Sequence, residues 1–293
     1  MYVVGRGHGG REGLRRGRLA DPPRGIHRTA GKQNRSGEGE MRKLFTCLAL
    51  LWILVMTVGS PSVSLGIDQG ETAERLWSER EAPEKAVEGI SAYESLLKER
   101  PEDYEVLLRL SRLHYWVGQN LEESNKEEAI THYGKGREYG KRASEIAPEK
   151  PGGYFFEAAN LARQNNLKGT FSNILGISTV RKLNEKTAGI DPDYFYRGTD
   201  RFFCAFYTKL PGLLGGSASK AIEFGERAVA NYPNYAGNRY FLAEAYVKDG
   251  KNDQARKELE AAAVLSDVEF PDAVPEQRME KKRAEALLKR IGK

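Results

Sequence analysis

The fold is decided by the stretch AGNRYFLAEAYVKDGKNDQARKELEAAA, residues 236–263. An Asp249-Gly250 pair, which is typical of turns, divides the stretch into two halves. Residues three and four apart share one face of a helix, so apolar residues at that spacing predict an amphipathic helix. Both halves show this spacing, with Leu242, Ala243, Tyr246, Ala255, Leu259 and Ala262. The stretch therefore predicts two helices that pack against each other around a tight turn.

Proline spacing extends this helix pair into a repeat. Three of the preceding blocks have mostly small or aromatic residues at matching offsets before a proline, such as Ala221, Gly225 and Ala228 before Pro233. Small residues let two helices approach closely, and proline ends a helix because it has no N–H to donate. The prolines that end the blocks are Pro101, Pro148, Pro192 and Pro233.

The pattern resembles the tetratricopeptide repeat (TPR), a helix–turn–helix unit of about 34 residues. With Pro233 at the thirty-second position of one repeat, Ala243 and Ala255 take the eighth and twentieth positions of the next. The resemblance implies an all-α fold, a right-handed superhelical array of TPR units in which helix A and helix B alternate. The unit near Phe195 departs from the pattern, because Phe202 occupies its small eighth position.

The repeats are longer than the family's unit. Their prolines are 47, 44 and 41 residues apart, an excess of 13, 10 and 7 residues over 34. We expect the extra residues as insertions between helix A and helix B, around 120–131, 168–178 and 209–219.

The array is expected to form one domain over residues 67–293. Thr72–Lys98 supplies a further helix pair at its start, and Glu276–Ile291 has the pattern of a C-terminal capping helix. The residues of that helix expected to face inward are Met279, Ala286, Leu287 and Ile291.

The N-terminal region has a different composition. Residues 1–40 are rich in Gly and Arg and are expected to be a disordered or mis-assigned leader. Residues 41–66 have the order of a signal peptide, with a cationic start at Met41, an apolar run over 44–58 and small residues after it. An uncleaved anchor is the alternative, although this run is shorter than the ~20 residues that span a bilayer. Both interpretations predict export to the periplasm or cell envelope, with membrane contact only through this segment if it stays uncleaved.

Charge argues against a nucleic-acid partner. The chain has 46 Lys and Arg against 41 Asp and Glu, a formal charge of +5. Residues 1–43 hold 11 of the basic and four of the acidic residues, which leaves 35 basic against 37 acidic in the remainder. A nucleic-acid-binding domain carries a clustered basic surface, whereas residues 44–293 have no excess of basic over acidic residues.

Catalytic signals are weak. Cys204 is the single cysteine outside the signal segment, and its neighbours Asp200 and Arg201 are the main reason to keep an enzyme as a hypothesis. A cysteine nucleophile needs a nearby base, and His114 and His132 are distant in sequence. We therefore expect no enzyme, no metal site and no cofactor.

In TPR proteins, positions two, five, nine and twelve of helix A line the concave surface. Carried onto four units of this sequence, six of sixteen such positions are aromatic, against 10% in the chain. Such a lining suits an apolar small ligand or a partner protein. In the alternative, the insertions or the capping helix fill the groove and these are core residues. The candidate groove residues are Arg112, Tyr115, Phe155, Tyr196, Phe203, Phe206, Tyr240 and Glu244.

A second candidate site precedes the helix that begins near Ala221. Gly215, Gly216 and Ser217 could offer backbone N–H groups to a carboxylate. The alternative is an ordinary helix cap after a flexible turn.

The sequence is also similar to a narrower family, the periplasmic T component of tripartite (TRAP) transporters, in Asp191–Arg201, Leu210-Pro211 and Gly215–Ser217. This resemblance implies an oligomer that associates with a solute-binding protein and handles hydrophobic ligands. The expected function is thus an exported TPR scaffold, and the narrower resemblance implies an accessory of such a transporter. The alternative is a purely structural protein that assembles an envelope or secretion complex.

Overall fold

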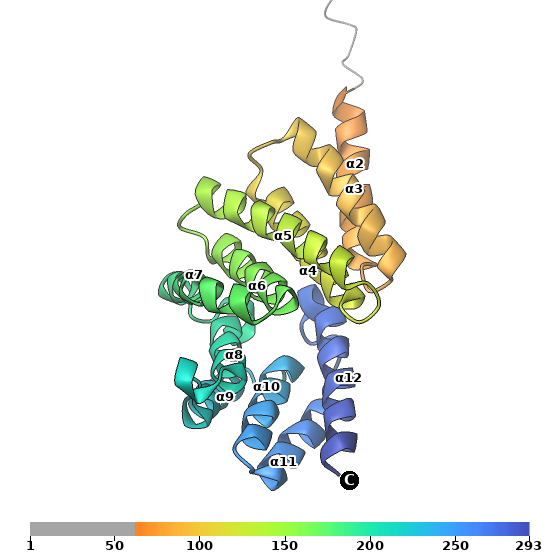
Figure 1. Ribbon diagram of the computed structural model, residues 1–293. Helices are drawn as coiled ribbons and strands as arrows, with labels where there is room; N and C mark the ends of the chain where they lie inside the picture. Colours follow the sequence, from red (N-terminus) through yellow and green to blue (C-terminus); the bar gives the residue numbers. More distant parts are fainter. Residues whose placement is uncertain (1–61, 293) are drawn as a thin grey trace, which may run out of the picture. The chain divides into compact units, whose positions relative to one another are not determined.

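The computed structural model describes residues 62–292, which form eleven α-helices, two short 3-10 helices and no strand (Figure 1). The predicted leader and nearly all of the predicted signal segment lie outside these residues. No described helix is long and apolar enough to cross a membrane. The elements are α2 (Ser62–Ser78), α3 (Pro83–Glu99), α4 (Tyr104–Leu121), α5 (Lys126–Ile146), α6 (Pro151–Lys168), α7 (Thr170–Ile190), α8 (Tyr194–Lys209), η1 (Gly212–Leu214), α9 (Ala218–Asn231), α10 (Ala236–Lys248), α11 (Asn252–Ala263), η2 (Pro271–Ala273) and α12 (Val274–Ile291).

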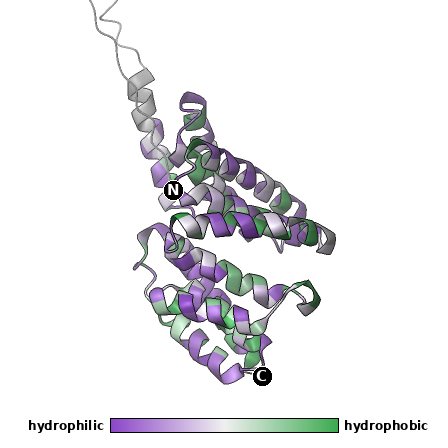
Figure 2. Ribbon diagram, turned by 90° about the vertical axis from the view of Figure 1, so that its left-hand side faces the viewer, coloured by the Kyte–Doolittle hydropathy of each residue, from purple (hydrophilic) through white to green (hydrophobic). Residues whose placement is uncertain are grey.

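The helices form successive pairs, from α2 and α3 to α10 and α11, followed by α12. Within the described residues these are five helix A–helix B units, which confirms the all-α superhelical array. The A helices also contact one another across units, α4 with α6, α6 with α8 and α8 with α10. Hydrophilic and hydrophobic residues alternate along the helices in Figure 2, as expected for helices that each bury one side.

Local sequence explains where helices begin and why they pack closely. Asp103 caps α4 by accepting hydrogen bonds from two backbone N–H groups of its first turn. Pro151 opens α6, where a missing N–H costs nothing. Gly140 lets α5 approach α6, because a Cβ there would lie 2.7 Å from the backbone nitrogen of Glu157. The predicted role of small residues at helix contacts is thereby borne out at this pair.

The extra residues of each unit take two forms. In the second and third units they lengthen the helices: α4 and α5 have 18 and 21 residues, and α6 and α7 also have 18 and 21. Only Gly169, with φ of 109°, separates α6 from α7. In the fourth unit they form a loop that contains η1, between α8 and α9.

The capping helix is α12, which packs against α10 and α11 (Figure 1). Its buried residues include Ala284 and Leu287, at 0% and 3% exposure. The expectation for Ala286 was wrong, because Ala286 is exposed. Position 284, three residues before Leu287, shares its face, whereas the adjacent position 286 is turned by about 100°.

The start of α12 is tied to the first helices of the array by buried arginines. Arg112 of α4 is 6% exposed, and its Nη1 donates to Asp272 Oδ2 at 2.6 Å. Arg80 donates from Nη2 to Glu276 Oε2 at 2.8 Å. The guanidinium groups of both arginines also lie over the ring of Trp77, at 3.9 Å for Arg80 and 4.5 Å for Arg112. We call these five residues the closure network.

In the closure network the charged forms of Asp272 and Arg112 are favoured, whereas burial lowers the pKa of Arg80. Burial alone would raise the pKa of Asp272, but Arg112 and Arg109 outweigh it and hold that pKa below its ordinary value. Because Arg112 is buried, the loss of its partner Asp272 would leave part of the arginine's charge uncompensated in the interior.

A histidine pair lies between α4 and α5. The Nδ1 atoms of His114 and His132 are 2.9 Å apart, and the His114 ring stacks on Tyr139 at 5.6 Å. Burial, with smaller contributions from His132 and Lys135, lowers the pKa of His114 to about 3. Burial also lowers the pKa of His132, although Glu128 partly opposes this. His114 is 1% exposed, so it is a packing residue of the core and is held in its neutral form.

Replacing Arg112 tests the closure network. We expect Arg112→Met to lower the free energy of unfolding by about 2 kcal/mol, because Asp272 keeps only Arg109 and Glu276 keeps only Arg80 as a partner. Urea unfolding followed by circular dichroism measures this. Lys141→Met, which breaks an exposed pair with Glu145 on α5, is the control and should change little. Equal stability of the two variants would contradict the role of Arg112.

The histidine pair predicts a pH dependence of stability. The folded pKa of His114 lies below its unfolded value, so its contribution is complete above about pH 6.5 and is lost as the pH falls towards 3. One proton taken up on unfolding corresponds to about 1.4 kcal/mol per pH unit. His114→Phe keeps the ring stack without the titration. Its stability between pH 7 and pH 5 should fall less steeply than that of the wild type, and an unchanged slope would refute the assignment.

Candidate functional site

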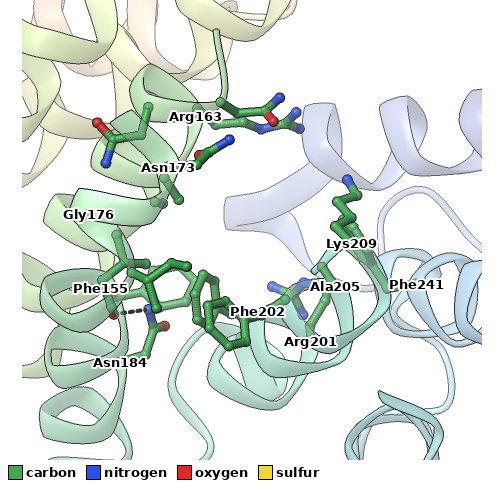
Figure 3. A pocket seen from close by; sticks show the side chains of 18 of the residues that line it. Phe155, Arg163, Asn173, Gly176, Asn184, Arg201, Phe202, Ala205, Lys209 and Phe241 are labelled. Carbon is green, nitrogen blue, oxygen red and sulfur yellow. Dashed lines mark hydrogen bonds between the residues drawn. The ribbon is translucent and has the colours of Figure 1, made fainter. Parts of the chain in front are cut away.

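A cavity of about 460 Å³ opens on the inner side of the array, between α6, α7, α8, the loop with η1 and the first turns of α12 (Figure 3). Most of its wall is aromatic and aliphatic, which suits an apolar ligand, and its volume lies within the range of small-molecule sites. The aromatic residues that line it, apart from two tyrosines, are Phe155, Phe156, Phe195, Phe202, Phe206 and Phe241.

The structure brings three of the eight predicted groove residues to this cavity: Tyr115, Phe155 and Phe206. Arg112 belongs to the closure network instead. Tyr240 and Glu244 lie outside the cavity on α10, where the Tyr240 hydroxyl donates to Glu244 Oε1 at 3.0 Å.

The other two predicted groove residues are packed elsewhere. Phe203 is 7% exposed and belongs to the core between α8 and α9, where its ring lies 5.1 Å from that of Phe224. Tyr196 stacks on Tyr235 at 4.9 Å. For Phe203 the filled-groove alternative is therefore the better description. Its neighbour Phe202 lines the cavity, a change of one residue that corresponds to about 100° around a helix.

The first turn of α8 explains why α8 departs from the repeat register. Phe195, Tyr196 and Arg197 have φ of 50°, 59° and 60°, the left-handed region that residues with a side chain rarely adopt. Arg201 holds the turn, donating to the Phe195 and Tyr196 carbonyls at 3.1 Å each. Asn238 of α10 also donates to the Tyr196 carbonyl, at 3.2 Å. Glycine or asparagine would have signalled a left-handed turn in the sequence, but these positions are occupied by Phe, Tyr and Arg.

Polar groups on α6 and α7 complete the wall, and sequence reasoning missed them. Asn184 is 1% exposed, and its Nδ2 donates to the Val180 carbonyl at 2.9 Å. Arg163 donates from Nη1 to Glu122 Oε2 at 3.3 Å. Figure 3 shows Arg163 and Asn173 on one side of the open space and Phe155 and Phe202 below it. Their grouping depends on how α6 folds back on α7, which repeat spacing does not encode.

The predicted carboxylate nest has its N–H groups occupied. Gly215 and Gly216 donate to backbone carbonyls of the same loop at 3.0 Å, and Ser217 donates to the Tyr207 carbonyl at 3.1 Å. The Ser217 hydroxyl caps α9 by accepting from the backbone N–H of Lys220 at 3.4 Å. In this conformation the ordinary helix cap is the correct interpretation, and the expectation of a nest is corrected.

Cys204 and its neighbours do not form a reactive group. Burial raises the pKa of the Cys204 thiol to about 12, and the thiol donates to the Phe241 carbonyl at 3.2 Å. Asp200 pairs with Arg227 and Arg197. A thiolate is the nucleophilic form of cysteine, so this environment works against nucleophilic catalysis at neutral pH. Within residues 62–292 no cluster of three or more His, Cys, Asp or Glu could hold a metal ion.

Two family profiles match parts of the chain. The profile of the TRAP transporter T-component family matches residues 151–292, and that of the regulator of microtubule dynamics protein 1-3 family matches residues 71–197. No curated protein matches the sequence at a significant level.

Solved structures give the fold. A thermophilic TPR protein from Thermus thermophilus is 20% identical, with a TM-score of 0.54, and the match covers 75% of this chain and 99% of that one. The protein MamA is 18% identical with a TM-score of 0.36, over 73% of this chain and 96% of that one. Together with the five helix pairs, the Thermus structure shows that the described part of this chain has the TPR fold, and its C-terminal half resembles the T component of TRAP transporters.

Proposed function

We propose that the chain is an exported TPR scaffold of the cell envelope that serves a TRAP-type transporter as an accessory and binds an apolar ligand in its cavity. The observation that carries this proposal is the aromatic cavity itself. Nearly all of its wall comes from residues 151–292, the segment that matches the T-component profile. The proposed function is binding, not catalysis.

A partner protein is the second part of the proposal. Large apolar side chains stand exposed beside the cavity: Leu175 of α7 is 66% exposed, and Leu213 in η1 is fully exposed. Their neighbours Ile174 and Leu214 line the cavity. Clustered exposed apolar residues are typical of interaction sites. A solute-binding protein that docks here would meet the ligand where it enters, and a homo-oligomer would present several such sites.

The proposed localisation rests on the N-terminal segment alone. Met41 is followed by two cations and an apolar run, and we propose that this signal directs export to the periplasm or envelope.

The alternative function is purely structural assembly of an envelope complex. The observation that favours it is α12, which occupies part of the concave side and engages Arg112, a predicted groove residue. Under this alternative the cavity is a packing defect and only outer surfaces bind partners.

Filling the cavity separates the two functions. Ala205→Trp places a large ring in the cavity, whereas Ala286→Trp adds the same ring at an exposed position of α12. With N-phenyl-1-naphthylamine as a fluorescent apolar probe, the first variant should bind at least about tenfold more weakly than the wild type, the loss expected when an apolar site is blocked. The second variant should bind as the wild type does. Equal probe binding by all three proteins, or none by the wild type, would favour the structural alternative.

Export has its own test. N-terminal sequencing of the protein from a periplasmic or envelope fraction should begin near Ile67 if the signal is cleaved where small residues follow the apolar run. A protein that retains Met41 and sediments with membranes would instead support the uncleaved anchor. A protein found only in the cytosolic fraction would contradict export.

A further inference from the structure

The acidic residues of the cavity wall already have counter-charges. Glu276 accepts from Arg80 at 2.8 Å, and Glu280 accepts from Arg283 at 2.9 Å. Neither of these arginines lines the cavity. The two carboxylates therefore contribute little net negative charge to the space.

The basic residues of the wall are compensated differently. Arg163 pairs with Glu122, but the two cations on α8 form no ion pair with any carboxylate of the described residues. Arg201 is 8% exposed and bonds only neutral oxygens, namely two backbone carbonyls and Asn238 Oδ1 at 2.7 Å. Lys209 is exposed at the rim, with its Nζ 5.9 Å from the centre of the Phe241 ring. The cavity thus carries positive charge that the protein does not neutralise.

Helix geometry places this charge along one stripe. Residues 201, 205 and 209 follow one another at intervals of four, so they share one face of α8. The middle position is Ala205, whose small side chain leaves room above the helix. A helical side chain leans towards the N-terminus of its helix, so the Lys209 chain leans back towards Ala205. Figure 3 shows Lys209 across the open space from Arg163.

The rest of the space suits a hydrocarbon chain. Phe155 and Phe202 form its floor, and Val180 and Ile177 of α7 form an aliphatic side. Exposed Leu214 and exposed Lys209 both line the cavity, so apolar wall and positive charge occur together at its exposed side. An apolar chain would therefore remain in apolar contact from the floor to the rim.

We propose that the cavity binds a single-chain amphiphile with an anionic head group, whose head lies above Ala205 against Lys209 and whose chain lies on Phe155 and Phe202. The anion supplies the counter-charge that the Arg201–Lys209 stripe lacks. Arg201 is buried without a carboxylate partner, which is costly, and Lys209 is exposed and free to contact the head group. A cationic amphiphile would meet like charge there. This inference rests on the proposed ligand-binding function and adds the chemistry of the ligand.

Competition by amphiphiles with a common ten-carbon chain tests the proposal. Decanoate, decyl phosphate, decanol and decyltrimethylammonium are each titrated, below their micelle concentrations, against N-phenyl-1-naphthylamine bound to the full chain. The anions should compete about tenfold better than decanol, as expected for one charge-assisted contact. If only decanoate competes better than decanol, the ligand class is a free carboxylic acid. If only decyl phosphate does, the ligand class is a phosphate ester. Equal competition by both would leave the anionic charge as the property recognised.

Variants of Lys209 test whether the Arg201–Lys209 stripe causes the preference for anionic amphiphiles. Lys209→Met should remove the anion preference while decanol competes as before, and Lys209→Glu should reverse it in favour of decyltrimethylammonium. Lys220→Met is the matched control: Lys220 is also exposed and lies 5.6 Å from an aromatic ring centre, but it does not line the cavity.

The failures are distinguishable. Probe binding with no preference for anions, or an anion preference that survives Lys209→Glu, overturns the inference and leaves the apolar site intact. Absence of probe binding to the wild type overturns both.

Discussion

The structure depends on the burial of Arg112. A guanidinium that is 6% exposed needs a counter-charge, and the chain supplies it from Asp272 and Glu276, about 160 residues later. To deliver those carboxylates, η2 and α12 cross from the last helix pair to the first ones. TPR arrays are ordinarily open, with each unit in contact only with its neighbours. Here the ends of the array are joined, and the first turns of α12 form part of the wall of the cavity.

Much of the fold could be predicted because its causes are local. The turn at Gly250, the prolines that end helices and Gly140 at a close helix contact are all readable from neighbouring residues. The site was less predictable for two reasons. The left-handed turn at Phe195 is built from residues that give no such signal. The partner of Arg112 is remote in sequence, so the repeat register placed Arg112 in a groove although the structure uses it for closure.

The surplus of aromatic residues at the predicted groove positions divides into two groups. Tyr115, Phe155 and Phe206 line the cavity, whereas Phe203 and Tyr196 do not line it and are packed against Phe224 and Tyr235. The sequence shows that aromatic residues are enriched at these positions, but it does not show which of them line the cavity. Adjacent residues of α8 point about 100° apart, so a shift of one residue moves a ring from the core to the cavity.

The left-handed turn has a consequence for how this sequence can change. At Tyr196 the backbone would be relaxed by glycine, which adopts positive φ freely, but glycine would delete the ring that stacks on Tyr235 and contacts Phe270. A relaxed backbone and an aromatic ring at position 196 therefore exclude each other. The strained turn is instead stabilised by Arg201, which donates hydrogen bonds to the Phe195 and Tyr196 carbonyls. Substitutions at these positions are therefore constrained jointly, and homologues that relax the turn should also have rebuilt the adjoining wall of the cavity.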